Sequence, residues 1–293
     1  MATMNILDAK DRGLSSTQMM WYRFSRNPAA VIGALMLLSV LILAVFAPWL
    51  TPYPKEVGAV VDFRSRHMPP GVHHWFGTDK VGRDIFSRTI FGFRVSLLLV
   101  LGVLGIAVPV GTLLGLIAGH YGGWIEKLIS GLTNVMLAIP PLVMALAVSN
   151  VLKPTLTNAM IAVTLVWWTW HARLVYAVSK SIAGEDYIEA ARLAGASTLH
   201  ILFREILPNC IPVISVKTTL DAAFVILFGA TLSFLGFGVS PPTPDLGSMI
   251  ADGRQFMPDY WWEVVCPGLA VFYVTLAFNL LGDGLRDMFD VES

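Results

Sequence analysis

The sequence predicts an all-α membrane protein with six transmembrane helices. First, 55% of its 293 residues are hydrophobic and only 14% are charged, whereas a typical soluble domain has roughly 25% charged residues. Second, the hydrophobic residues form uncharged runs, several of which reach the roughly 20 residues that a helix needs to cross a bilayer. The 25 glycines and 17 prolines fit this class, because neighbouring helices can satisfy the backbone groups that such residues free inside a membrane.

The apolar runs define the predicted spans in order. A helix is expected wherever about 20 mostly apolar residues follow one another, and a charged or Pro-rich stretch ends it. The fifth run is interrupted by two charged residues, and the fourth is short but extends through polar residues on both sides. We place the six helices at residues 29–50, 95–119, 128–152, 156–172, 209–236 and 264–281.

The first and fourth spans need separate justification. The first ends at Pro48 and Pro52, and its apolar stretch exceeds the roughly 7–15 residues of a signal-peptide core, so we interpret it as a retained anchor. The fourth contains Trp167, Trp168 and Trp170. Such a cluster is typical of the aromatic belt at a membrane surface.

Six spans divide the rest of the chain into tails and loops. We expect a cytoplasmic tail at 1–28, an extracytoplasmic loop at 51–92, a helical membrane domain at 93–285 and a cytoplasmic tail at 286–293. Two arginines close to the first span, against one lysine beyond it, favour a cytoplasmic N-terminus. Over the whole first loop, which is rich in Lys and Arg, this bias nearly disappears. An even number of spans places both termini on the same side.

Two features predict local packing within the spans. Pro140 and Pro141 interrupt the third span, and proline inside a helix usually bends it. The second span carries a series of glycines that would let a neighbouring backbone approach closely. They are Gly102, Gly105, Gly111, Gly115 and Gly119.

Hydrophobicity stops between the fourth and fifth spans, where a helix–turn–helix elbow is expected. Residues 185–194 are rich in helix formers and begin with carboxylates, which favour a helix N-terminus. Gly195 allows a sharp turn, and Ser197 or Thr198 can cap a second helix that leads to Pro208. An apolar stripe on that second helix is formed by Leu199, Leu202 and Phe203.

The elbow contains a recognisable set of residues: Glu189, Ala190, Ala191, Gly195, Ile206, Leu207 and Pro208. They resemble the Glu-Ala-Ala loop of permeases in bacterial ATP-binding-cassette (ABC) importers. The family has an apolar residue two positions before the Leu-Pro pair, where this chain has Glu205. The resemblance implies that the elbow is a cytoplasmic coupling helix seated in a groove of an ATPase. Glu189 and Arg192 would then make charged contacts at the rim of that groove, which set register more than affinity.

Three further stretches narrow the resemblance. They are the Gly-Thr-Asp-x-x-Gly-Arg-Asp motif (Gly77, Thr78, Asp79, Gly82, Arg83, Asp84), the Pro-rich stretch from Leu232 to Gly247, and Ala277–Asp287. Together they are similar to the C-type permease subunits of dipeptide, oligopeptide and nickel importers, over roughly residues 20–290. From its residues alone, the Gly77–Asp84 motif is a pair of turns that anchors the second span, and we assign it no chemistry.

The resemblance implies a role and a set of partners. The chain would form half of a translocation path in a bacterial cytoplasmic (inner) membrane, with the transmembrane fold of a type I ABC importer. Its partners would be a homologous permease subunit, two cytoplasmic ATPase subunits and an extracytoplasmic solute-binding protein, beside membrane lipid. ATP and Mg would bind the ATPases, and we expect no cofactor on this chain. Similar permeases serve dipeptides, longer peptides, glutathione, haem and nickel complexes. A stand-alone secondary transporter or channel is the competing class, although no internal repeat supports it.

Polar residues inside the spans are candidates for the translocation path. Lys217 and Asp221 lie four residues apart and share a helix face. A charge at the bilayer centre costs about 2.5–3.5 kcal/mol, against about 0.2–0.5 kcal/mol returned by such a pair. The pair therefore cannot face lipid at the midplane: either both residues lie near the inner end of the span, with Lys217 reaching the interface, or they face the bundle or a wet path. A structural role and a role in the path both stay open. Asn134 in the third span is a further candidate.

Several other functions lack any sequence signal. The chain contains no phosphate-binding loop and no Gly-Lys dipeptide, so we expect no ATP site of that kind. We find no catalytic motif and no metal-ligand spacing, and we interpret Cys210 and Cys266 as buried thiols. The net charge is zero, so no basic footprint for nucleic acid is present.

Overall fold

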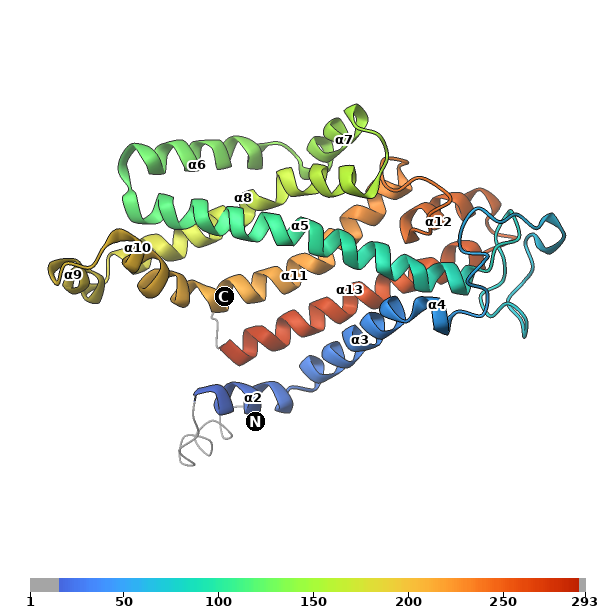
Figure 1. Cartoon of the computed structure of the whole chain (residues 1–293), viewed down its shortest axis with the longest axis horizontal. Coiled ribbons are helices and arrows are strands. Elements are labelled where there is room, and N and C mark those ends of the chain that lie inside the picture. Colours follow the sequence, from blue (N-terminus) through green and yellow to red (C-terminus); the bar gives the residue numbers. More distant parts are fainter. Residues whose placement is uncertain (1–15, 290–293) are drawn as a thin grey trace.

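The computed structural model describes residues 16–289 as an elongated helical bundle without a β-strand in that range (Figure 1). The long helices run roughly along its longest axis. They are α3 (Pro28–Val45), α5 (Ile85–Tyr121), α8 (Leu156–Ala183), α11 (Leu207–Phe234) and α13 (Trp262–Phe289).

Shorter elements connect and cover these helices. At one end of the bundle lie the two arms of the elbow, and at the other lie the first loop and α12 (Figure 1). The shorter elements are α2 (Ser16–Arg26), α4 (Ala47–Leu50), η1 (Phe63–Ser65), α6 (Gly123–Ala138), α7 (Pro141–Val151), α9 (Asp186–Leu193), α10 (Thr198–His200), the π-helical η2 (Ile201–Ile206), α12 (Leu246–Gly253) and η3 (Arg254–Phe256).

The described helices account for a multi-span membrane protein. By length and apolar composition, four helices can cross a bilayer: α3, α5, the continuous helix Thr198–Phe234, and α13; the bent pair α6–α7 makes a fifth if it counts as one span. α8 is outside that set, but its 28 residues extend about 42 Å at 1.5 Å per residue. It lies against α5 from Met160 to Ser179, which makes it the sixth long element of the bundle. The predicted all-α membrane fold is confirmed.

Two helices are longer than their apolar runs predict. α5 begins ten residues before the predicted 95, because Asp84 caps it by accepting a hydrogen bond from the Ser87 amide at 2.7 Å. α8 continues eleven residues beyond the predicted 172. Its charged residues Arg173 and Lys180 do not end it, since each bonds to a residue of α6.

The third predicted span, 128–152, is a broken one. α6 ends at Ala138 and α7 starts at Pro141, and the two helix axes differ by 87°. Because Pro140 and Pro141 lack amide hydrogens, the helical ladder cannot continue through them. The predicted bend is therefore confirmed, and it is sharp enough that 128–152 is not one straight helix.

Close packing of α5 against α8 follows most of the glycine series. A Cβ at Gly111 would lie 2.5 Å from the Trp168 carbonyl oxygen, and one at Gly115 would lie 2.6 Å from that of Ala172. Gly102 and Gly119 also face α8, as the sequence predicts. Gly105 is the exception, because it has no neighbour within 4 Å of its Cβ position.

The tryptophan cluster of α8 packs into the bundle through Trp167, while Trp168 and Trp170 are partly buried. Trp167 is 2% exposed and packs edge-to-face on Trp170 and Phe228, with ring centroids 5.0 and 5.3 Å away. The interpretation as a surface aromatic belt is wrong. The cluster lies near the middle of α8, which is longer than the apolar run indicated, so these rings are far from its ends.

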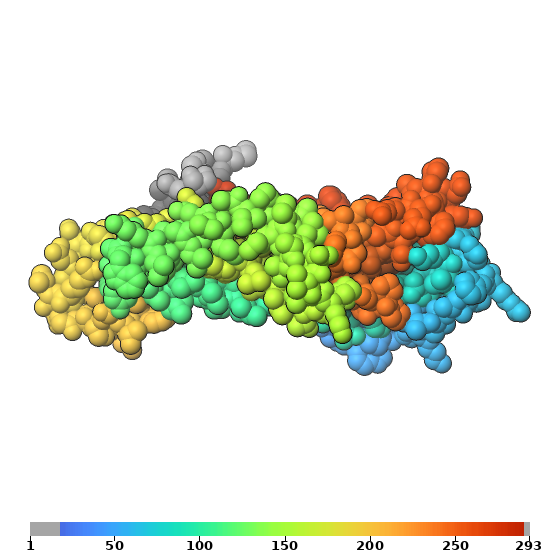
Figure 2. Space-filling model, turned by 90° about the horizontal axis from the view of Figure 1, so that it is seen from above, coloured from blue at the N-terminus to red at the C-terminus, as the bar shows by residue number. Residues whose placement is uncertain are grey.

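The two ends of the bundle differ in character. Figure 2 shows the elbow (yellow) projecting at one end, with the first loop (cyan) and the α12 region (orange) gathered at the other. α2 and the C-terminal end of α13 both lie towards the elbow end (Figure 1). The described ends of the chain are thus on the same side as the elbow.

Candidate coupling elbow and polar path

The first arm of the elbow, α9, is held by one buried side chain. Ile188 is fully buried, whereas Glu189, Ala190 and Arg192 on the same helix are exposed. Leu193 at its end is 85% exposed. An isolated eight-residue helix is not stable by itself, so the packing of Ile188 fixes α9 and leaves its other faces free.

The turn between the arms has the geometry that its sequence predicts. Gly195 adopts φ +84°, a left-handed conformation that costs other residues roughly 1–2 kcal/mol. The Ser197 hydroxyl then accepts a hydrogen bond from the His200 amide at 3.3 Å and caps the second arm. The expected elbow is present, with Ser197 as its cap.

The second arm is continuous with the fifth span. From Thr198 the chain stays helical to Phe234, a length of about 55 Å. Residues 201–206 adopt a π-helix, which often occurs at functional positions. Pro208 follows directly, and the side-chain amide of Asn209 donates to the Glu205 backbone carbonyl at 2.7 Å. The elbow is therefore a rigid extension of a long membrane helix.

A small apolar cluster ties the elbow to three long helices. It combines residues from both arms with side chains of α5, α8 and α11, and we call it the elbow cluster. Its buried members are Leu116, Val175, Ile188, Ile201, Leu202, Ile206 and Cys210. The other members of the predicted stripe, Leu199 and Phe203, are 67% and 47% exposed. The elbow is therefore packed against three spans, while an apolar surface of its second arm stays uncovered.

Lys217 and Asp221 form a partly buried ionic group on α11. The Lys217 ammonium donates to one oxygen of Asp221, and the Asp221 side chain is 1% exposed. The second Asp221 oxygen lies 3.1 Å from Nε2 of His171, which is fully buried on α8. Lys217 also lies over the Trp170 ring, 5.3 Å from its centroid. Periodicity pairs Lys217 with Asp221 but gives no sign that His171 joins them.

This ionic group borders an open cavity between α8 and α11, which we call the α8–α11 cavity. Its volume is about 580 Å³. Its walls are mainly apolar, with two cationic side chains and one carboxylate. They comprise Trp170, Arg173, Leu174, Ala177, Lys217, Asp221 and Phe224. The third predicted path residue, Asn134, does not line it.

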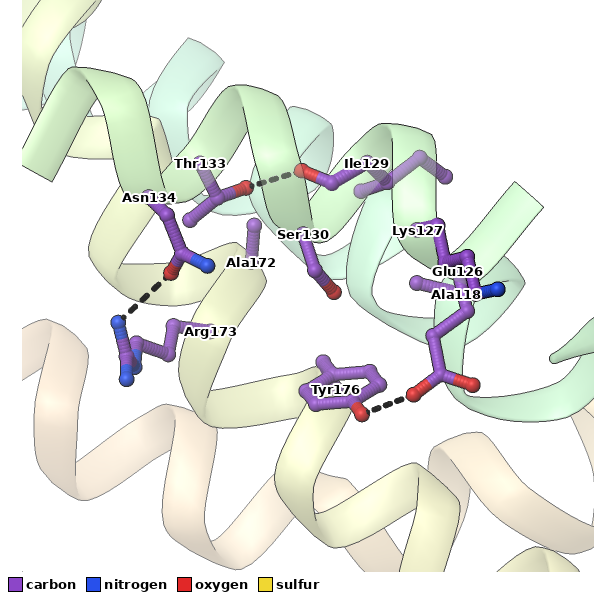
Figure 3. A pocket seen from close by; sticks show the side chains of 10 residues that line it. All are labelled: Ala118, Glu126, Lys127, Ile129, Ser130, Thr133, Asn134, Ala172, Arg173 and Tyr176. Atoms are coloured by element: carbon purple, nitrogen blue, oxygen red, sulfur yellow. Dashed lines mark hydrogen bonds between the residues drawn. The ribbon is translucent and has the colours of Figure 1, made fainter. Parts of the chain in front are cut away.

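Asn134 lines a second hollow, a cleft of about 280 Å³ between α6 and α8. Figure 3 shows Arg173 and Asn134 facing each other at one end of this cleft and Tyr176 and Glu126 at the other. The Arg173 guanidinium donates to the Asn134 oxygen at 3.0 Å. Arg173 therefore borders both the cleft and the α8–α11 cavity. The sequence did not predict this position, because the predicted fourth span ended at residue 172.

The Gly77–Asp84 motif forms a hydrogen-bonded knot at the opposite end of the bundle. Asp79 accepts from the amides of Val81 and Arg83, at 3.0 and 2.9 Å, and from Nε of Arg83 at 2.7 Å. Thr78 bridges the chain, since its hydroxyl accepts from the Met68 amide at 2.8 Å. Gly82 has φ +86°, and a Cβ there would lie 1.9 Å from the Asp62 carbonyl oxygen.

This knot fastens α5 to the first loop and also to α13, whose Trp262 indole donates to the Thr78 carbonyl at 3.4 Å. Asp84, the cap of α5, also lies 2.9 Å from Nδ1 of His74. Nδ1 of His67 lies 2.6 Å from the buried Glu263 carboxylate, which stands in the first turn of α13. These contacts support the anchoring role read from the sequence. Among residues 16–289, no group of three or more His, Cys, Asp or Glu side chains could hold a metal ion.

Comparison with known proteins agrees with this architecture. Residues 111–291 match the family described as the binding-protein-dependent transport system inner membrane component. This chain therefore belongs to that family, whose members are membrane subunits of transport systems that use a binding protein. A separate stretch, residues 15–70, matches the N-terminal transmembrane domain of oligopeptide transport permease C. The resemblance to C-type peptide permeases is confirmed.

Individual relatives cover nearly the whole chain. A dipeptide transport system permease protein of Alkalihalophilus pseudofirmus is 41% identical over 92% of this chain and 87% of its own. A di/tripeptide transport system permease protein of Pseudomonas aeruginosa is 41% identical over 92% of this chain and 90% of the relative. A glutathione transport system permease protein of Escherichia coli is 41% identical over 92% of this chain and 88% of the relative. A chain of the MetNI methionine ABC transporter is 20% identical, with a TM-score of 0.48, over 65% of this chain and 91% of its own.

Proposed function

We propose that this chain is a permease subunit that carries short peptides into the cell and is driven through its elbow by ATPase subunits. The observation that carries the proposal is the elbow itself. It exposes Leu193, Leu199 and Phe203 at one end of the bundle, while its buried side is locked into α5, α8 and α11 through the elbow cluster. An exposed apolar surface of this kind marks an interaction site.

The contacts of both arms of the elbow support the proposal that it transmits movement of the ATPases to the membrane helices. α9 carries the exposed Glu189, Ala190 and Arg192, where small and charged residues suit a shallow groove with a polar rim. The second arm is one helix with α11, so a push at Thr198 acts on a lever about 55 Å long. Closure of the ATPases would rock α11 and open the path alternately to either side.

The proposed assembly follows from the family. This chain would pair with a homologous permease, two ATPases that bind ATP and Mg, and an extracytoplasmic binding protein. The elbow and both chain ends would face the cytoplasm, and the knot with α12 would face outward. ATP hydrolysis would belong to the partners, with this chain itself non-catalytic. Peptides are the proposed cargo because the relatives named above carry dipeptides, di- and tripeptides or glutathione.

Reconstitution tests this function. The chain would be purified with its partner permease, ATPases and binding protein, and placed in proteoliposomes. We expect uptake of dipeptides that requires both ATP and the binding protein. A variant with Gly195→Pro should lose uptake and release the ATPases, since proline cannot adopt a positive φ. Uptake by this chain alone would instead establish a stand-alone transporter.

A further inference from the structure

Arg173 is a cation without an anionic partner. Its guanidinium donates to Asn134, a neutral amide, and among residues 16–289 no carboxylate lies within ion-pair distance of it. Lys217, the other cation of the α8–α11 cavity, is matched by Asp221. The walls of the cavity therefore carry one positive charge in excess. An unmatched charge of this kind needs an anion or water beside it.

Arg173 and Lys217 lie at similar distances from the ends of α8 and α11 that are nearer to the elbow. Arg173 lies ten residues before the end of α8, and Lys217 lies ten residues after the start of α11. At 1.5 Å per residue, both are about 15 Å from the elbow end of their helices. Within a hydrocarbon core a guanidinium that faces lipid is strongly disfavoured, whereas one that faces water, the partner subunit or the passing solute is not. The open α8–α11 cavity offers Arg173 such surroundings.

We propose that Arg173 binds the carboxylate of the transported solute as it passes the α8–α11 cavity. This inference rests on the proposed function and assigns the solute class: a small molecule with a free carboxylate, such as the C-terminus of a dipeptide. A guanidinium offers two parallel N–H donors that match a carboxylate. The cavity of about 580 Å³ is within the usual range for small ligands.

The remaining contacts suit transient binding. Asn134 holds the Arg173 guanidinium in place without cancelling its charge. A solute carboxylate can therefore bind the guanidinium and leave again. Trp170 and the exposed Phe224 offer apolar contact to the rest of the solute. Asp221 keeps Lys217 from adding a second unmatched charge, which would hold an anion too tightly for transport.

The test compares free and blocked carboxylates in the complete importer. Proteoliposomes take up a defined mixture of dipeptides, or the same dipeptides as C-terminal amides, and mass spectrometry measures both. Rates are normalised to the affinity of the binding protein for each peptide. Because the same binding protein loads every variant, any change in the acid-to-amide ratio arises in the permease. The variants are Arg173→Gln, Arg173→Lys and Asn134→Asp, with Lys153→Gln as a control cation in the exposed connection before α8.

We expect the wild-type importer to prefer the acids by about tenfold, which corresponds to about 1.4 kcal/mol. The ratio should fall to about one in Arg173→Gln, stay between these values in Arg173→Lys, and remain at the wild-type value in Lys153→Gln. In Asn134→Asp the new carboxylate neutralises Arg173, so the ratio should also fall, without loss of the arginine.

Two results would overturn the inference. One is an unchanged ratio in Arg173→Gln and Asn134→Asp. The other is failure of the Arg173→Gln complex to assemble together with an unchanged ratio in Asn134→Asp, which would show that Arg173 pairs with the partner permease. If the wild-type importer takes up neither acids nor amides with ATP, the proposed peptide function itself fails, which is a different outcome.

Discussion

Removing either member of the Lys217–Asp221 pair should have unequal effects on stability. Lys217→Met leaves the Asp221 carboxylate with only the His171 ring beside it, and because the Asp221 side chain is only 1% exposed, the free energy of unfolding should fall by about 3–5 kcal/mol. Asp221→Leu leaves Lys217, whose side chain is 31% exposed and can reach water. The free energy of unfolding should therefore fall less in Asp221→Leu, by about 1–3 kcal/mol.

The double variant Lys217→Met/Asp221→Leu completes the comparison. It leaves no charge unmatched, so its stability should lie close to that of wild type, within about 1 kcal/mol. Reversible chemical unfolding in mixed micelles measures the free energy of unfolding of the wild type, the two single variants and the double variant. The reasoning is refuted if Asp221→Leu costs more than Lys217→Met, or if the double variant costs the sum of both. Transport by the double variant then separates the two roles: a structural pair predicts normal uptake, and a path pair predicts its loss.

Further predictions concern the elbow, the helix contact and the outer knot. Ile188→Ala should detach α9 and cost about 2–5 kcal/mol of local stability, seen as faster amide exchange in residues 186–193. Gly195→Ala should cost about 1 kcal/mol through its positive φ alone, because no atom lies within 4 Å of the new Cβ, and should lower the peptide transported per ATP. Gly115→Val should force α5 from α8 and cost about 1–3 kcal/mol in thermal unfolding, whereas Gly105→Val should have little effect. Asp79→Asn should weaken the knot by about 1–3 kcal/mol, since the Arg83 guanidinium loses its carboxylate.

The sequence predicted most of the architecture because its signals are local. Long apolar runs must form helices in a bilayer, since the backbone has no other hydrogen-bond partners there. Gly195, Ser197 and the Pro140–Pro141 pair likewise act through their own backbone geometry. Each of these predictions matches the structure, because none depends on what the segment packs against.

The remaining features depend on contacts between distant segments. Arg173 seemed to end the fourth span, yet α8 continues through it because Asn134 on α6 accepts its hydrogen bond. Trp167 resembled a surface residue because the apolar run ended a few residues later. His171 gave no signal, since its contact with Asp221 joins two helices fifty residues apart in sequence. A single sequence holds no record of such pairs.

Cross-linking of the elbow to an ATPase tests the central claim most directly. Leu193, which is 85% exposed, would be changed to Cys in the assembled importer, and a cysteine would be placed in turn along the surface groove of the ATPase. The wild-type chain, which contains only the native Cys210 and Cys266, serves as the control for cross-links formed by these two cysteines. We predict a disulfide cross-link whose yield changes with ATP and which abolishes peptide uptake until it is reduced. The account would be contradicted by an importer that takes up peptide with ATP although Leu193→Cys forms no cross-link with any cysteine of the groove. In that case α9 would also stay accessible to thiol reagents.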